Sequence, residues 1–457
     1  MSKYCVTLAA FFVGSVAGLR AAEPPTSAPR PIPLTRPEMK QLLEEMKART
    51  PRIPLPEMTD EENTKLGERG SNYEGRLRHH YMPAGSTSGF GGGAGERDPA
   101  MTLDNAFKVE LFWIVSRANN CQYCQGHQES KLLRAGLKED DIAALDGDWA
   151  GFSAKDRSAF AFARKITYQP HLVGDADIKG LKEHFTDLQI LEMLMSVAGN
   201  NAINRWKEGL GVPQSAGGGG FGNAKGAEPT PEKHTYLTPT STKYSGVLTK
   251  VAPLQVDEQG KPTGRTVSTR PPLESKAEVE KALQAARLRT PRLPLVGEEK
   301  ARTAMPEDFP KDAPLPQWAS LMANFASGKA RIAAQLNADD KGDLKPLLKA
   351  RVAWIIARQD RAWFAVSDAK TRLKRLGQTD DQIDALDGDW KNFDETDRAL
   401  FTVATKLGTS PVVLTDDDVA SAVKLAGPKT VVQLVNFVTV RASFGRITEA
   451  AGLQVGK

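Results

Sequence analysis

A short stretch of the chain, NNCQYCQGH at residues 119–127, contains two cysteines and a histidine at regular spacing. Cys121 and Cys124 are two of the three cysteines in 457 residues, and His127 follows three positions after Cys124. Two thiols this close can cycle between dithiol and disulfide, and they can also bind a metal ion. We therefore expect redox or metal chemistry at this position.

The expected local structure favours reactive thiols. We expect Asn120 to cap a helix, which places Cys121 and Cys124 in its first turn. Unpaired N–H groups and the positive end of the helix dipole there stabilise a thiolate and lower the pKa of a cysteine. Attack of that thiolate on an O–O bond gives a sulfenic acid, which a second thiol converts to a disulfide.

An acidic residue, Glu110, precedes Cys121 by eleven positions between apolar neighbours. On one straight helix these two residues would lie about 16 Å apart. The polar RANN segment, residues 117–120, is suited to a turn that would shorten this distance. We interpret Glu110 as a proton relay, with a buried structural salt bridge as the alternative.

The order of Glu110, Cys121, Cys124 and His127 resembles the alkylhydroperoxidase-like superfamily, which also contains the carboxymuconolactone decarboxylases. The resemblance implies a small helical bundle without a cofactor, in which Cys124 attacks a hydroperoxide and Cys121 resolves the product as a disulfide. It also implies that Glu110 and His127 relay protons. The family's histidine usually stands one position later, where this chain has Gln128.

The chain is a tandem duplication with a register of 241 residues that holds from about residue 107 to residue 212, in which AALDGDWAGFSAKDRSAF from position 143 matches DALDGDWKNFDETDRALF from position 384. An earlier pair, ARTPRIPLP from position 48 and LRTPRLPLV from position 288, matches at a shift of 240. The second copy lacks every proposed chemical residue. The equivalents of Glu110, Cys121, Cys124 and His127 are Arg351, Ala362, Ala365 and Asp368. Both copies keep the DGDW sequence that ends at Trp149 and Trp390. The lost residues are therefore interpreted as functional and the retained ones as structural.

The same comparison suggests residues that bind substrate. Asn200, Asn201 and Asn204 become Arg441, Ala442 and Gly445 in the second copy. We expect the three asparagines to line a substrate pocket, or alternatively to form a polar helix face. Tyr123 lies between the cysteines, where it could donate a hydrogen bond to a peroxide or shield the thiols.

Apolar residues recur every three or four positions in both copies, which predicts an all-α fold of two tandem bundles with about six helices each. We expect domains at residues 36–214 and 276–457, joined by a Gly/Pro-rich linker at 215–275. Expected helix caps besides Asn120 are Ser153, Asp175 and Thr186, and Gly136 is expected to end a helix.

The first residues have the pattern of a secretory signal peptide, expected at 1–22, with an uncleaved membrane anchor as the alternative. Cleavage would remove Cys5 and export the chain. The formal net charge of +5 is spread along the chain, so we expect no nucleic-acid partner.

These observations predict a thiol-dependent peroxidase with a hydroperoxide substrate and a dithiol reductant protein as partner. The resemblance also implies oligomers, commonly trimers or hexamers, with the fused pair acting as a pseudo-dimer. The alternatives are a lactone decarboxylase, or a scaffold whose cysteines form a structural disulfide or bind a metal. The remaining histidines have no metal-ligand spacing with the cysteines and are interpreted as surface or loop residues: His79, His80, His171, His184 and His234.

Overall fold

The protein is represented by a computed structural model. It describes residues 27–67, 72–83, 101–214 and 270–456, together with 236–239, 241–244, 258–259, 261, 263, 266 and 268. The regular structure of these residues is helical and contains no β-strand, which confirms the predicted all-α class. The predicted signal peptide, the segment 84–100 and most of the predicted linker lie outside the described residues.

The helices of the first copy and of the segment before it are α1 (Arg36–Glu45), α2 (Asp60–Leu66), α3 (Tyr73–Tyr81), α4 (Asn105–Asn119), α5 (Gln122–Arg134), α6 (Glu139–Ala144), α7 (Ala154–Tyr168), α8 (Asp175–Lys182) and α9 (Asp187–Leu210). Those of the second copy are α10 (Lys276–Arg287), α11 (Glu298–Ala304), α12 (Gln317–Met322), α13 (Gly328–Asp340), α14 (Pro346–Asp360), α15 (Trp363–Arg375), α16 (Asp380–Asp384), α17 (Glu395–Gly408), α18 (Asp416–Ala426) and α19 (Pro428–Ala450). Short 3-10 helices lie at Met46–Ala48, Pro170–Leu172, Thr242–Tyr244 and Ala385–Asp387.

Helix α14 begins and ends 241 residues after α4 does, and α15 begins and ends 241 residues after α5 does. The retained DGDW sequence has the same structure in both copies. Trp149 and Trp390 have positive φ angles of 60° and 58°, and each indole N–H donates to a carbonyl four residues earlier, at 2.8 Å. This supports a structural role for the retained residues.

Local capping explains several helix boundaries. Ser153 accepts from the Asp156 N–H at 3.1 Å at the start of α7, and Thr186 accepts from Gln189 at the start of α9, as predicted. Gly136 follows α5 with a φ of +94°, which suits glycine at a helix end. The prediction for Asp175 was wrong by one position, because Gly174 is the N-cap and Asp175 is the first residue of α8.

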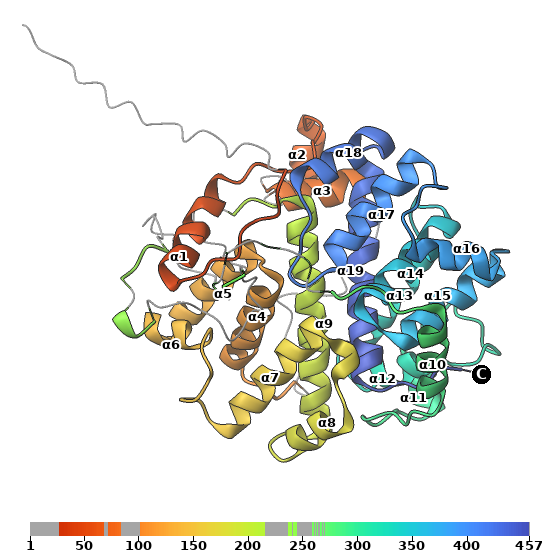
Figure 1. Ribbon diagram of the computed structural model, residues 1–457, viewed down its shortest axis with the longest axis horizontal. Helices are drawn as coiled ribbons and strands as arrows, with labels where there is room; N and C mark the ends of the chain where they lie inside the picture. Colours follow the sequence, from red (N-terminus) through yellow and green to blue (C-terminus); the bar gives the residue numbers. More distant parts are fainter. Residues whose placement is uncertain are drawn as a thin grey trace, which may run out of the picture.

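The two copies meet along α9 and α19, which lie side by side in the middle of the molecule (Figure 1). Arg205 of α9 donates to the carbonyl oxygens of Gly408 and Thr409 in the second copy, at 3.0 and 3.2 Å. Its equivalent, Arg446 of α19, donates to the carbonyl oxygen of Thr167 in the first copy at 3.2 Å. Residues 167 and 408 are themselves equivalent, so the contact has the reciprocal form of a two-fold interface.

Two further ion pairs, also reciprocal, connect the copies. Arg52 binds Asp416 at 2.5 Å, and its equivalent Arg292 binds Asp175 at 2.7 Å. One difference breaks the symmetry at the centre: Asn119 faces Arg205 at 3.4 Å in the first copy, whereas the matching Asp360 forms an ion pair with Arg446 at 2.6 Å.

Candidate functional site

The cysteines lie at a sharp turn between α4 and α5. Asn120 ends α4 in the left-handed conformation with a φ of 56°, and the Cys121 N–H donates to the Ser116 carbonyl at 2.9 Å. Cys121 is itself the N-cap of α5, and Cys124 lies in the first turn. The turn that we expected at residues 117–120 is present. The prediction that Asn120 caps the following helix was wrong, because Asn120 instead closes the preceding one.

Both sulfurs are reduced and buried in this structure. Cys121 is 0% exposed and Cys124 is 2% exposed. Burial raises the pKa of the Cys121 thiol well above its ordinary value, and its contact with the Cys124 side chain raises it further. The predicted lowering of the pKa by the helix start is therefore wrong for Cys121, since desolvation outweighs the helix dipole.

A buried lysine lies beside the cysteines. Lys207 of α9 forms an ion pair with Glu74 of α3 and donates to the Tyr123 hydroxyl at 3.4 Å. Burial lowers the pKa of Lys207, but Glu74, Tyr123 and Cys124 together raise it by more, so the net change is upward. Burial raises the pKa of Glu74, but Lys207 and Arg78 lower it to about 2. Lys207 is thus a cation at neutral pH, and it interacts electrostatically with Cys124.

The rings of Tyr123 and His127 stack on each other, with their centroids 4.4 Å apart. His127 Nδ1 lies 3.1 Å from the Tyr123 carbonyl oxygen, which can only accept, so Nδ1 carries the proton and Nε2 carries the lone pair. Burial lowers the pKa of His127 to about 4, with a further contribution from Lys207. The imidazole is therefore neutral at pH 7. Tyr123 is buried, and its hydroxyl accepts from Lys207.

The structure does not bring Glu110 to the cysteines, which corrects the relay prediction. Helix α4 continues unbroken for nine residues beyond Glu110, a rise of about 14 Å. Burial raises the pKa of Glu110 to about 7, and the further causes are Asp156, Asp104 and Asp141 rather than a thiol. In the second copy, Arg351 occupies this position and forms an ion pair with Asp397, the equivalent of Asp156, at 2.9 Å.

The predicted substrate asparagines contribute to a buried hydrogen-bond network instead. Asn119 donates to both Asn201 and Asn204, at 3.0 and 2.9 Å. Asn204 donates to the Ser116 hydroxyl at 3.2 Å, and Arg205 donates to Asn201 at 3.1 Å. Both asparagines are 0% exposed, so the pocket-lining prediction was wrong for them; they hold the end of α4 that carries the cysteine turn. Asn200 is also buried, on the same helix.

A segment before α1, residues 30–34, covers the turn and is called the strap here. Asn120 donates to the Arg30 and Pro31 carbonyl oxygens at 3.1 and 3.2 Å, and Arg117 donates to the Pro33 carbonyl oxygen at 3.1 Å. At the end of the strap, Arg36 binds Glu129 of α5 at 2.6 Å, with both side chains buried. These contacts hold the strap over the start of α5.

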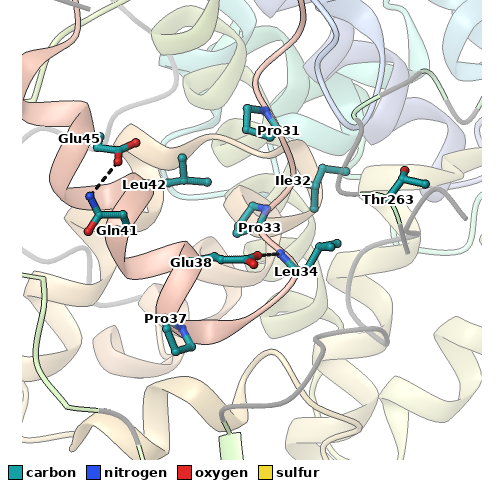
Figure 2. Close-up of a pocket in the computed structure, with 10 residues that line it drawn as sticks. All are labelled: Pro31, Ile32, Pro33, Leu34, Pro37, Glu38, Gln41, Leu42, Glu45 and Thr263. Carbon is teal, nitrogen blue, oxygen red and sulfur yellow. Dashed lines mark hydrogen bonds between the residues drawn. The ribbon is translucent and has the colours of Figure 1, made fainter. Parts of the chain in front are cut away.

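A cavity of about 680 Å³ lies against this strap (Figure 2). It is lined by Pro31, Ile32, Pro33, Leu34, Pro37, Glu38, Gln41, Leu42, Glu45 and Thr263. Neither cysteine lines it. The strap contributes lining residues to the cavity and hydrogen-bond acceptors to the turn, so it contacts both.

The buried face of α5 is unusually polar. The side-chain carbonyl oxygens of Gln122, Gln125 and Gln128 are buried without a hydrogen-bond partner among the described residues. The second copy has Trp363, Val366 and Ala369 at these positions. Unpaired acceptors in a protein interior are uncommon, and they favour water or a polar ligand near the thiols.

The sequence interpretation missed Lys207 and Glu74. Comparison of the copies could have found Lys207, because its equivalent is Thr448, whereas the adjacent Glu208 is kept as Glu449. Glu74 lies outside the region where the register holds, so only folding brings it to the site.

None of the described helices is long and apolar enough to cross a membrane. Neither the protein-family models nor the curated proteins that were searched gave a match to this chain.

Proposed function

We propose that the chain is a thiol-dependent peroxidase, or a closely related disulfide oxidoreductase, that works through Cys121 and Cys124. The observation that carries this proposal is the joint loss of a whole buried cluster from the second copy. The second copy has Ala362, Ala365, Phe364 and Thr448 in place of Cys121, Cys124, Tyr123 and Lys207. It nevertheless keeps the turn: Arg361, between α14 and α15, is left-handed with a φ of 51°, as Asn120 is between α4 and α5. A role in folding alone would be required equally in both copies.

Cys124 is the proposed nucleophile because Lys207 interacts electrostatically with it. Its thiolate attacks the outer oxygen of a hydroperoxide, so that an S–O bond forms and the O–O bond breaks. The alkoxide leaves and takes a proton, which gives an alcohol. Cys121 then attacks the sulfenic acid, a disulfide forms and water leaves.

The proposed proton groups differ from those of the family pattern. The neutral His127 has a lone pair on Nε2 that can accept the thiol proton. Lys207 and the Tyr123 hydroxyl that it contacts can return a proton to the leaving alkoxide. Glu110 has no part in this scheme.

Access is the demanding step, because a substrate must reach sulfurs that are 0% and 2% exposed. Displacement of the strap, the backbone segment that accepts hydrogen bonds from Asn120, would open a path from the adjacent cavity. The same burial favours a second candidate function, in which the cysteines form an inert structural pair of a scaffold protein.

The remaining parts of the proposal concern partners and location. A dithiol protein would return electrons to the disulfide, and no cofactor is required. We further propose that the chain is exported, and that any oligomer assembles from the fused pair as its unit.

The test is consumption of an organic hydroperoxide with a dithiol donor by the native chain, Cys124→Ser and Cys121→Ser. The peroxidase proposal predicts that Cys124→Ser abolishes turnover, and that Cys121→Ser permits one round and accumulates a sulfenic acid that dimedone traps. The scaffold alternative predicts no peroxide consumption by any of the three. Equal turnover by all three would exclude the dithiol mechanism.

A further inference from the structure

Three potential metal ligands lie together where α2 meets α3. Glu62 comes from α2, and His79 and His80 come from the last turn of α3. One nitrogen of each histidine and one carboxylate oxygen lie within 4.8 Å of one another, and all three residues are half-buried. None of them belongs to the thiol site.

The distances between the donor atoms are close to those of a coordination sphere. His79 Nε2 lies 3.3 Å from Glu62 Oε1, and His80 Nδ1 lies 3.9 Å from the same oxygen. Around a tetrahedral zinc ion with bonds of 2.0–2.1 Å, neighbouring donors are about 3.3 Å apart. The His80 nitrogen lies about 0.6 Å farther from the carboxylate oxygen than this spacing.

The carboxylate is already oriented for this role. Glu62 Oε2 accepts from the Thr59 N–H at 3.0 Å and from the Thr59 hydroxyl at 3.3 Å, as part of the capping box of α2. Oε1 is thereby directed to the histidines. Hydrogen bonds of this kind fix the geometry of metal-binding carboxylates.

The ring of His80 packs against the rings of His79 and Tyr81 and has its Nδ1 3.9 Å from Glu62. Its Nε2 is buried and has no hydrogen-bond partner among the described residues. If Nε2 carries the proton, the Nδ1 lone pair faces the Glu62 oxygen, and a cation between the two atoms would satisfy both.

We propose that Glu62, His79 and His80 bind a divalent ion of the zinc class, with a fourth position left for water or another ligand. Two imidazoles and one carboxylate are a donor set that zinc accepts. The ion would fasten α2 to α3, the helix that also carries Glu74. This inference is independent of the proposed peroxidase activity.

The experiment is a zinc titration of the full-length chain that carries Cys5→Ser, Cys121→Ser and Cys124→Ser, which removes all three thiols as competing ligands. Calorimetry should show one equivalent of zinc. Glu62→Gln, His79→Asn and His80→Asn, each added to this background, should weaken binding at least tenfold. His184→Asn, an exposed histidine elsewhere, is the matched control and should bind as the parent does.

Glu62→Gln keeps the capping box, since glutamine can replace glutamate there, so this variant separates loss of binding from loss of folding. Cobalt provides a second measurement, because a tetrahedral site gives intense visible absorption that these substitutions should remove. Absence of stoichiometric zinc binding by the parent, or binding that survives His79→Asn and His80→Asn together, would overturn the proposal.

Discussion

Arg205 and Arg446 occupy equivalent positions in α9 and α19, and each donates hydrogen bonds to the backbone of the copy that does not contain it. Both guanidinium groups are buried. Because these bonds cross the interface, we expect the two copies to unfold as one cooperative unit.

Arg205→Met should therefore destabilise the whole chain. It removes the Arg205 donor from the buried carbonyl oxygens of Gly408 and Thr409, and takes one of two donors from the side-chain oxygens of Asn119 and Asn201, which should cost about 3 kcal/mol. Urea unfolding followed by circular dichroism measures this loss. Lys182→Met, at an exposed ion pair, is the control and should change the free energy of unfolding by less than about 1 kcal/mol.

Lys207→Met should slow the reaction of Cys124 with peroxide at least tenfold, because it removes the cation beside the thiol. Lys207→Arg retains the charge and should recover part of the rate. Stopped-flow measurement of sulfenic acid formation in the Cys121→Ser background reports this step directly. If the Lys207→Met variant forms the sulfenic acid as fast as the protein that keeps Lys207, then Lys207 has no part in the mechanism.

Glu110→Gln should leave peroxide turnover unchanged and stabilise the chain at alkaline pH. The pKa of Glu110 is raised from 4.5 to about 7 on folding, so the folded state holds the proton more tightly and stability falls as pH rises from about 4.5 to 7. After allowance for solvent screening, the gain for glutamine is on the order of 1–2 kcal/mol at pH 8, and near zero at pH 4. Thermal unfolding at both pH values checks the sign. If Glu110→Gln loses peroxide turnover, the proton-relay role that the sequence suggested for Glu110 would be supported.

His127 should make the chain sensitive to acid. Its pKa is lowered from 6.5 to about 4 on folding, so the neutral form stabilises the fold above pH 6.5 and this contribution is lost as pH falls towards 4. The loss should reach about 3 kcal/mol, at about 1.4 kcal/mol for each pH unit. His127→Gln should flatten this part of the stability curve. His184→Asn, the exposed control, should keep the native slope.

Arg36→Met should expose the cysteines by loosening the strap. It removes the buried ion pair with Glu129 next to the strap and leaves that carboxylate only the Trp113 indole N–H, at 3.2 Å. The reaction of both thiols with Ellman's reagent should accelerate at least tenfold if opening of the strap limits access. Lys182→Met, at the exposed ion pair of α8, should react at the native rate. An unchanged rate for Arg36→Met would place the entry path elsewhere.

The helical class and the boundaries at Ser153, Thr186 and Gly136 could be predicted from the sequence, because they depend on residues close together in the chain. The roles of Glu110, Asn201 and Asn204 could not. The continuous α4 separates Glu110 from the thiols, and partners more than 80 residues away pair with the asparagines. The sign of the Cys121 pKa shift was missed for the same reason, since burial is a property of the whole fold.

The difference between Asn119 and Asp360 at the centre of the interface has a genetic consequence. In an assembly of identical subunits any substitution appears on both sides of the axis, so each side must tolerate it. Fusion into one polypeptide lets the halves diverge independently, and an amide can face Arg205 while a carboxylate faces Arg446. A complete oxidant titration would then yield one disulfide per molecule, where an unfused ancestor with the same chemistry would yield two.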